Sequence, residues 1–364
     1  MTIKEICSHF DIGGEYVGCE ENFSGNINNT FKVTFMRDGE IKEYILQKIN
    51  KNVFKEPEKV MENIVRITDH IREKVIKRSG CTRTGVLRAF PSLQSRFYYV
   101  VDDIGEYWRC YRYIKNSTTY DACDDLSLIE KMGVAFGKFQ NDLIDFDAES
   151  LYITIPDFHD TKKRYNALRQ AIALDPLKRV KKVENEIFKL LSFEEKACLL
   201  QEYIDNNQIP LRVTHNDTKC NNVSFDKDTG ELLAVLDLDT VMPGVVAHDF
   251  GDAIRFIANT RKEDDPNYKL VKIDLDKFES FTKGFVGEIK GLLTDLEKQT
   301  LVLGAFNMTV EVAVRFLTDY ILGDVYFRNK YPGHNVDRTK NQIALAEDMF
   351  VNFDKMQEIV NRYL

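Results

Sequence analysis

Residues 211–256 read LRVTHNDTKCNNVSFDKDTGELLAVLDLDTVMPGVVAHDFGDAIRF and carry polar side chains at a fixed spacing. His215, Asp217 and Asn222 stand in the pattern H-x-D-x-x-x-x-N. In phosphoryl-transfer enzymes this pattern marks the loop where an Asp takes the proton of the acceptor hydroxyl and an Asn binds magnesium. The pattern therefore predicts Asp217 as the catalytic base and Asn222 as a metal ligand. We expect His215 to brace the loop through hydrogen bonds and not to move a proton.

An apolar strand and a second carboxylate follow this loop. The run 232–236, LLAVL, predicts a strand covered on both faces, and Asp237 stands at its end. Because strand side chains alternate, Asp237 and Asp239 are expected to project from the same face. We predict Asp237 as the other magnesium ligand, with Asp239 as a further ligand or as its partner. Mg²⁺ keeps several waters, so one carboxylate and one amide are enough protein ligands.

The triplet Asp249-Phe250-Gly251 spells the metal-binding motif of protein kinases. It lies 32 residues after Asp217, however, and it follows no apolar strand. We therefore expect Asp249 to cap a helix that starts near Gly251 and to brace the catalytic loop.

The composition excludes several classes of protein. The chain has 364 residues, a net charge of -8 and 43% hydrophobic residues, as expected of a globular protein of one to three domains and not of a nucleic-acid binder. No apolar run approaches the roughly 18 residues that cross a bilayer. The N-terminus lacks the apolar core of a signal peptide, and the seven Cys have no metal-type spacing. We expect a reduced, cytoplasmic protein that neither associates with a membrane nor requires a protein partner.

Residues 1–114 are predicted to form a nucleotide-binding lobe. Alternating apolar residues around Asp38-Gly39 predict a β-hairpin, and apolar residues three or four apart predict a helix over 56–78 that ends near Gly80. Further strands are expected at 85–90, 95–101 and 107–114. A small antiparallel sheet with one main helix is typical of a kinase N-terminal lobe.

Five residues of this lobe are candidates for holding ATP: Gly25, Thr30, Tyr111 and Tyr113, described next, and Gln47, described below. The polar loop 24–30 can turn backbone N–H groups and hydroxyls toward phosphate oxygens, which points to Gly25 and Thr30. The same composition also suits an ordinary hairpin loop. Near the end of the last strand, backbone groups around Tyr111 and Tyr113 could meet an adenine.

Residues 115–364 are predicted to form a larger, mainly helical lobe, so the fold class is α+β, two-lobed and protein-kinase-like. Apolar stripes indicate helices at 126–147, 161–174, 181–206, 272–292, 295–322 and 340–364, with a polar connector at 326–342. Arg315 stands beside one such stripe. It could form a helix ion pair with Glu311 or Asp319, or it could meet an oxygen-rich ligand at the edge of a cleft.

Three segments, THNDTKCNNVSFD, LDLDTVMPG and DFGDAIRF, resemble the aminoglycoside-phosphotransferase-like (choline kinase-like) small-molecule kinases. More narrowly, the chain resembles the N-acetylhexosamine 1-kinases, and the likeness extends to NINNTFKVTF, YILQKIN, FHDTKKRY, RFLTDYILGDVYF and KYPGHNVDRTKNQI. The resemblance implies transfer of the γ-phosphate of ATP, with Mg²⁺, to the anomeric hydroxyl of N-acetylglucosamine or N-acetylgalactosamine.

The resemblance also implies roles for individual residues. It makes Asp217 the base, which also contacts the substrate, and it places Thr240, Arg315 and Tyr326 against the sugar. A hydroxyl, a cation with several donors and a phenol suit a polyol. Asn26 falls in the sugar site where related loops carry a His.

The chain departs from protein kinases at Gln47, which stands where they carry the phosphate-binding Lys. Lys48 is next to it, but strand alternation points it to the opposite face. Gln47 is therefore expected at the nucleotide phosphates, with magnesium and backbone groups supplying the positive charge. Two alternatives stay open: a kinase of another small alcohol, such as an aminoglycoside or another hexose, and a ligand-binding pseudokinase.

Overall fold

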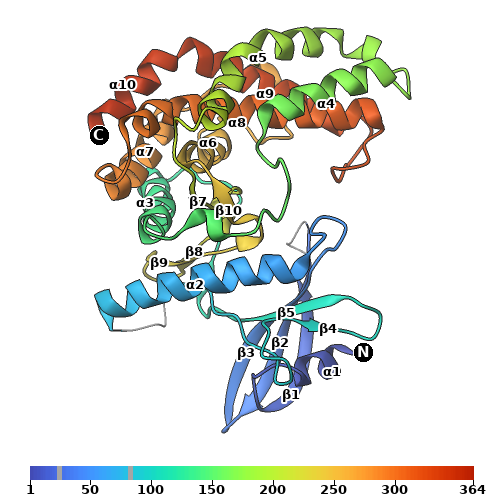
Figure 1. Cartoon of the computed structure of the whole chain (residues 1–364), viewed down its shortest axis with the longest axis vertical. Helices are drawn as coiled ribbons and strands as arrows, with labels where there is room; N and C mark the ends of the chain where they lie inside the picture. Colours follow the sequence, from blue (N-terminus) through green and yellow to red (C-terminus); the bar gives the residue numbers. More distant parts are fainter. Residues whose placement is uncertain (23–26, 81–84) are drawn as a thin grey trace. The chain divides into compact units, whose positions relative to one another are not determined.

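The computed structural model describes residues 1–22, 27–80 and 85–364 (Figure 1). The chain divides into two compact units. Unit 1 comprises Met1–Thr119, Asp145–Pro156 and Val223–Pro243, and unit 2 comprises Tyr120–Ile144, Asp157–Asn222 and Gly244–Leu364. Unit 1 thus takes in two short pieces of sequence from beyond its N-terminal segment.

Unit 1 contains a five-stranded antiparallel sheet with the order β1-β2-β3-β5-β4. The hairpin between β2 and β3 turns at Asp38 and Gly39, both with positive φ (54° and 77°), as the Asp-Gly signal predicts. Across β3 and β5, Gln47 lies opposite Arg109. The strands are β1 (Glu15–Asn22), β2 (Asn29–Arg37), β3 (Glu40–Lys48), β4 (Val100–Val101) and β5 (Tyr107–Arg112).

The described part of residues 1–119 also contains the helices α1 (Ile3–Ser8) and α2 (Pro57–Ser79). The predicted helix over 56–78 is confirmed, and Gly80 ends it in the left-handed conformation (φ 66°). One face of the sheet is sealed by a cluster that joins α1 to the strands through Ile6, Val33 and Leu46.

Two of the predicted strands are wrong. Segment 85–90 forms only a single bridge, between Ala89 and Tyr111, and the predicted strand 95–101 is reduced to β4. Between the two segments, the Ser92 hydroxyl accepts hydrogen bonds from the backbone N–H groups of Gln94 (3.3 Å) and Ser95 (3.5 Å), and this turn competes with strand pairing at the start of 95–101.

A second sheet of unit 1 has the order β6-β8-β9 and comprises β6 (Ser117–Thr118), β8 (Val223–Asp226) and β9 (Leu232–Val235). The prediction that the run 232–236 is covered on both faces is wrong. In β9 only Ala234 is fully buried, and the other three residues are partly exposed. The strand also ends earlier than predicted. Asp237 adopts the left-handed conformation (φ 54°, ψ 60°) and a 3₁₀ turn, Leu238–Thr240, follows, so strand alternation does not relate Asp237 to Asp239. The short strand β10 (Met242–Gly244) comes next.

Unit 2 is mainly helical, which with the sheets of unit 1 confirms the predicted α+β, protein-kinase-like class. Its helices are α3 (Leu126–Asp142), α4 (Thr161–Leu174), α5 (Glu184–Asp205), α6 (Val246–Ile257), α7 (Leu275–Ile289), α8 (Asp295–Leu322), α9 (His334–Val351) and α10 (Phe353–Tyr363). It also holds the short strand β7 (Arg212–Thr214). Glycines let α3 and α7 pack closely: a Cβ on Gly133 would lie 2.2 Å from the carbonyl oxygen of Phe281.

Helix α8 is the core helix of unit 2. A capping box of Thr294 and Glu297 starts it, and Gly323 (φ 113°) ends it as predicted. By length and composition it is the one helix among the described residues that could cross a membrane. However, 94% of its apolar window is buried inside the protein, as expected of the core of a soluble fold.

The predicted polar connector 326–342 is wrong in its second half, because α9 begins at His334, directly after Gly333 (φ 88°). The polar residues are misleading because they are buried and paired. Asn335 donates to the Asp319 carboxylate (2.9 Å), and the Asn341 side chain accepts a hydrogen bond of 2.9 Å from Asn259. The single helix predicted over 340–364 is interrupted at Asn352, between α9 and α10.

Candidate functional site

The catalytic loop of unit 2 is held from behind by a buried carboxylate on α6. Asp249 accepts hydrogen bonds from the backbone N–H groups of His215 (2.9 Å) and Asn216 (2.7 Å), and from the Gln140 side chain. It therefore braces the loop as predicted. It does not cap the helix, however, because α6 already begins at Val246 and Asp249 lies within its first turn.

His215 is fully buried and has a structural role, as predicted. Its ring meets Phe136 and Phe139 edge-on, and its Nδ1 accepts a hydrogen bond of 3.3 Å from the backbone N–H of Asp217. The ring therefore fixes the backbone from which the Asp217 side chain projects.

The carboxylate of Asp217 is held by two residues that follow it. Lys219 Nζ lies 2.6 Å from Asp217 Oδ1, and Asn222 Nδ2 lies 2.8 Å from Asp217 O and 3.3 Å from its Oδ2. Burial by itself would raise the pKa of Asp217, but the Lys219 ammonium outweighs it and the pKa is lowered. Asp217 is thus a carboxylate at neutral pH. Lys219 was not predicted as a site residue, although it stands inside the same motif.

The side chain of Asn222 is oriented by these contacts. Its amide nitrogen donates to Asp217, so its Oδ1 is left to bind a metal ion. Among the described residues this oxygen accepts no hydrogen bond. A neutral oxygen of this kind fits Mg²⁺. In residues 1–22, 27–80 and 85–364 no group of three or more His, Cys, Asp or Glu is arranged to hold a metal. Asn222 carries an amide oxygen and Asp237 a carboxylate, and both are hard oxygen ligands of the kind that Mg²⁺ prefers.

Arg315 on α8 lies among aromatic rings, and its charge also helps to lower the pKa of Glu311 without forming an ion pair. Its guanidinium lies 5.3 Å from the ring centre of Phe158, 5.9 Å from that of Tyr326 and 5.6 Å from that of Phe327. The predicted ion pairs with Glu311 and Asp319 do not form within the described part of the chain. Asp319 instead accepts hydrogen bonds from the backbone N–H groups of 325–327. Arg315 and Tyr326 are therefore neighbours, with the phenol ring 60% exposed.

Glu311 connects α8 to the catalytic loop through a histidine that the sequence analysis did not single out. His159 lies between Glu311 Oε1 (3.0 Å from Nδ1) and the backbone oxygen of Asn216 (3.2 Å from Nε2). Burial would raise the pKa of Glu311, but the facing His159 lowers it to about 2. His159 lies in the segment FHDTKKRY that carries part of the family resemblance, but it precedes the loop by more than fifty residues and no spacing links the two.

In unit 1, two predicted ATP-binding residues contact each other. Gln47 Nε2 donates to Thr30 Oγ1 (3.0 Å) across β2 and β3. Tyr111 is buried, and Tyr113 lies beneath the ammonium of Lys32, which is 5.8 Å from its ring centre. The predicted residues Gly25 and Asn26 lie outside the described residues.

The turn after Asp237 is buried and charged. Asp239 and Thr240 are 4% and 7% exposed. Both carboxylate oxygens of Asp239 face the guanidinium of Arg109 on β5, and Asn28 Nδ2 donates to Oδ2 at 2.7 Å. Asp239 is thus a partner in an ion pair. Arg109 was not predicted as its partner, because it is 130 residues from Asp239.

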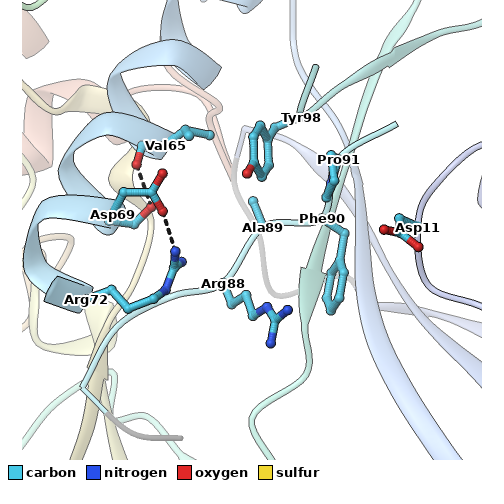
Figure 2. A pocket seen from close by; sticks show the side chains of 10 residues that line it. Asp11, Val65, Asp69, Arg72, Arg88, Ala89, Phe90, Pro91 and Tyr98 are labelled. Carbon is cyan, nitrogen blue, oxygen red and sulfur yellow. Dashed lines mark hydrogen bonds and ion pairs between the residues drawn. The ribbon is translucent and has the colours of Figure 1, made fainter. Parts of the chain in front are cut away.

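Unit 1 also has a cavity of about 260 Å³ beside α2. Figure 2 shows Asp69 and Arg72 of α2 on one side of it and Arg88, Phe90 and Tyr98 on the other. None of the residues predicted to bind ATP, metal or sugar lines this cavity. It is therefore separate from the candidate site.

The loop at Asp217 thus has a buried brace, an adjacent lysine and an oriented amide oxygen, an arrangement that suits phosphoryl transfer. Comparison with protein families places the chain accordingly: residues 19–276, well over half of it, match the phosphotransferase enzyme family (APH), and the chain belongs to that family. It is a small-molecule kinase, which transfers phosphate from ATP to an alcohol.

Solved structures share the fold at low sequence identity. A microcompartment-associated aminopropanol kinase is 14% identical, with a TM-score of 0.58 and 97% of each chain covered. A putative aminoglycoside phosphotransferase from Ralstonia eutropha JMP134 is 14% identical, with a TM-score of 0.54 over 99% of this chain and 97% of that one. Choline kinase from Cryptosporidium parvum Iowa II is 12% identical, with a TM-score of 0.54 over 97% and 94%. These likenesses show the fold alone.

Proposed function

We propose that this kinase transfers the γ-phosphate of ATP to the anomeric hydroxyl of an N-acetylhexosamine, N-acetylglucosamine or N-acetylgalactosamine. The observation that carries the proposal is Arg315, a cation that contacts aromatic rings and forms no ion pair within the described residues. A cation outside any ion pair of the described residues, beside the exposed Tyr326, suits a neutral, oxygen-rich ligand. It opposes a polycation such as an aminoglycoside, which requires carboxylates.

Asp217 is the proposed base. Its carboxylate is ionised and fixed by Lys219 and Asn222, so it can orient the acceptor hydroxyl and accept its proton. Lys219 keeps this charge in place and adds a positive charge where the phosphoryl group accumulates negative charge. Asn222 and Asp237 are the proposed ligands of Mg²⁺, which offsets charge on the phosphate oxygens when it is bound.

The sugar and the nucleotide are assigned to separate sets of residues. Thr240, Arg315, Tyr326 and Asn26 are proposed to contact the sugar together with Asp217. For ATP, we assign the loop and strands of the N-terminal lobe, 1–114, and the catalytic residues belong to 115–364. The ATP contacts are Gly25, Thr30, Gln47, Tyr111 and Tyr113.

The test is an ATP-dependent assay over a panel of acceptors: the two N-acetylhexosamines, unmodified hexoses, small amino alcohols and aminoglycosides. We expect kcat/KM to be highest for an N-acetylhexosamine. Arg315→Gln should raise the KM for the sugar about tenfold, because it removes a hydrogen-bonded cation worth roughly 1.5 kcal/mol. Lys131→Gln, a change on the outer side of α3, is the matched control. Preference for an aminoglycoside would favour the alternative kinase, and no turnover of any acceptor would favour a ligand-binding pseudokinase.

A further inference from the structure

A buried ion pair in unit 1 is not explained by the proposed roles. Arg109 and Asp239 are 1% and 4% exposed. Removing two charges from water costs several kcal/mol, and well-packed apolar residues in their place are often equally stable. Stability alone therefore gives no reason for the pair, which points to a geometric role.

The position of Arg109 in the sheet is informative. It lies on β5 directly opposite Gln47, the residue that stands where protein kinases carry their lysine. Arg109 Nε donates to Gln47 Oε1 at 3.0 Å. The positive charge that is missing from β3 is thus present one strand away, at the same level of the sheet.

The contacts of Arg109 leave it unable to act as that lysine does. Its two terminal nitrogens bind the two carboxylate oxygens of Asp239, with Nη2 to Oδ2 at 2.9 Å, and Nη1 also lies 3.9 Å from Met61 Sδ. Its guanidinium covers Tyr111, 5.1 Å from the ring centre. A planar group held on three sides and almost fully buried does not reach a phosphate.

Asp239 also anchors the 3₁₀ turn that follows Asp237. Besides Arg109 it binds Asn28, and its backbone oxygen accepts from Thr154 Oγ1 (3.4 Å). Just beyond the turn, Asn63 of α2 donates to the carbonyl oxygen of Val241 at 3.0 Å. The sheet, α2 and the segment around Thr154 therefore all fix this turn.

We infer that Arg109 and Asp239 form a positioning pair, which fixes the metal-binding Asp237 by tying its turn to the sheet. In protein kinases a lysine of the sheet pairs with a helix glutamate and binds phosphate. In this chain the cation of the sheet, Arg109, pairs instead with Asp239 in the turn that carries Asp237. We call this turn, residues 237–240, the metal turn, and Arg109 acts on the metal through Asp237. The inference rests on the proposed metal role of Asp237, but it does not depend on which alcohol is phosphorylated.

The test measures metal binding directly, with Mn²⁺ as the probe in the presence of ADP, followed by electron paramagnetic resonance. The double variant Arg109→Met/Asp239→Leu removes both charges and leaves neither one unpaired. We expect it to fold, with Mn²⁺ bound 10- to 100-fold more weakly, as is typical when a residue that orients a metal ligand is lost. Unchanged Mn²⁺ affinity in the folded double variant would overturn the inference.

Arg109→Lys is the second variant, because it keeps the charge and the fold but loses the two-point contact. It should weaken Mn²⁺ binding several-fold and leave the affinity for metal-free ADP unchanged. If Arg109→Lys weakens metal-free ADP and leaves Mn²⁺ affinity unchanged, Arg109 is a phosphate ligand and the inference fails. Because neither readout requires an acceptor, an inactive acceptor panel would sink the proposed function without affecting this result.

Discussion

The catalytic loop of unit 2 and the metal turn of unit 1 are both fixed by a buried carboxylate, but in different ways. Asp249 acts on the backbone N–H groups of the catalytic loop. Asp239 acts on side chains, those of Asn28 and of Arg109 on a distant strand. A loop held through its backbone keeps its shape whatever its side chains are, whereas the metal turn depends on the identities of Asp239 and its partners. The two halves of the proposed site should therefore respond differently to mutation.

The largest effect is expected at the catalytic loop itself. Asp217→Asn removes the proton acceptor and keeps the size of the side chain, so kcat should fall by about 10²- to 10⁴-fold with little change in Tm. Steady-state kinetics and thermal denaturation measure both. Asp228→Asn, in the exposed turn before β9, is the matched control and should stay near the native rate. A native rate for Asp217→Asn would mean that Asp217 is not the base.

At the metal turn the signature should be dependence on magnesium. Asp237→Asn replaces a charged ligand with a neutral one, so we expect about 10- to 100-fold more Mg²⁺ to be needed for half-maximal rate, with a smaller loss of rate at saturating Mg²⁺. Titration of activity with MgCl₂ measures this. If Asp237→Asn and Asp217→Asn gave the same Mg²⁺ dependence, the division of roles between the two regions would be wrong.

Loss of the Asp249 brace should lower the stability of the protein as well as its catalytic rate. Asp249→Asn cannot accept hydrogen bonds from two backbone N–H groups and Gln140 as a carboxylate does, so it should lower the free energy of unfolding by about 2–4 kcal/mol. Denaturant unfolding checks this, with the exposed Asp276→Asn on α7 as the control. An unchanged free energy of unfolding would contradict the brace.

The smallest expected effect is a loss of stability at low pH, and it involves His248 on α6, the helix that also carries Asp249. His248, next to Asp249, is buried among His159 and α8, and burial followed by the charge of His159 lowers its pKa to about 3. Below about pH 6.5 the unfolded state binds a proton at His248 that the folded state does not, so stability is lost as the pH falls from 6.5 toward 3.

His248→Leu removes this proton uptake. The decrease in the free energy of unfolding between pH 6.5 and pH 5 should then be smaller by up to about 2 kcal/mol than in the native protein. Parallel denaturant titrations at the two pH values measure the difference. An equal decrease in both proteins would show that His248 is not the group responsible.

The same contrast explains how much of the molecule could be predicted from sequence. Asp249 and His215, which brace the catalytic loop, lie within residues 211–256, and the helix α8 is encoded by its own spacing, so these features were predictable. The pair of Arg109 and Asp239, and the contact of His159 with Glu311, join residues that are far apart in the chain and have no pattern. The strand ending in Asp237 was misjudged because its left-handed turn breaks the alternation.

The buried polar start of α9 was missed for a related reason. Residues such as Asn335 and Asn341 give the composition of a loop, yet each is paired inside the protein. Composition reports the polarity of a segment and not whether a partner exists for it.

The most direct test of the central claim is the position of the phosphate on the product. The enzyme is incubated with ATP, Mg²⁺ and N-acetylglucosamine or N-acetylgalactosamine, and the product is examined by ³¹P and ¹H NMR beside a reaction with the 1-deoxy sugar. We predict phosphorus coupling to the anomeric proton and no turnover of the 1-deoxy sugar. Phosphate at the 6-hydroxyl, or turnover of the 1-deoxy analogue, would contradict the assignment as a sugar 1-kinase.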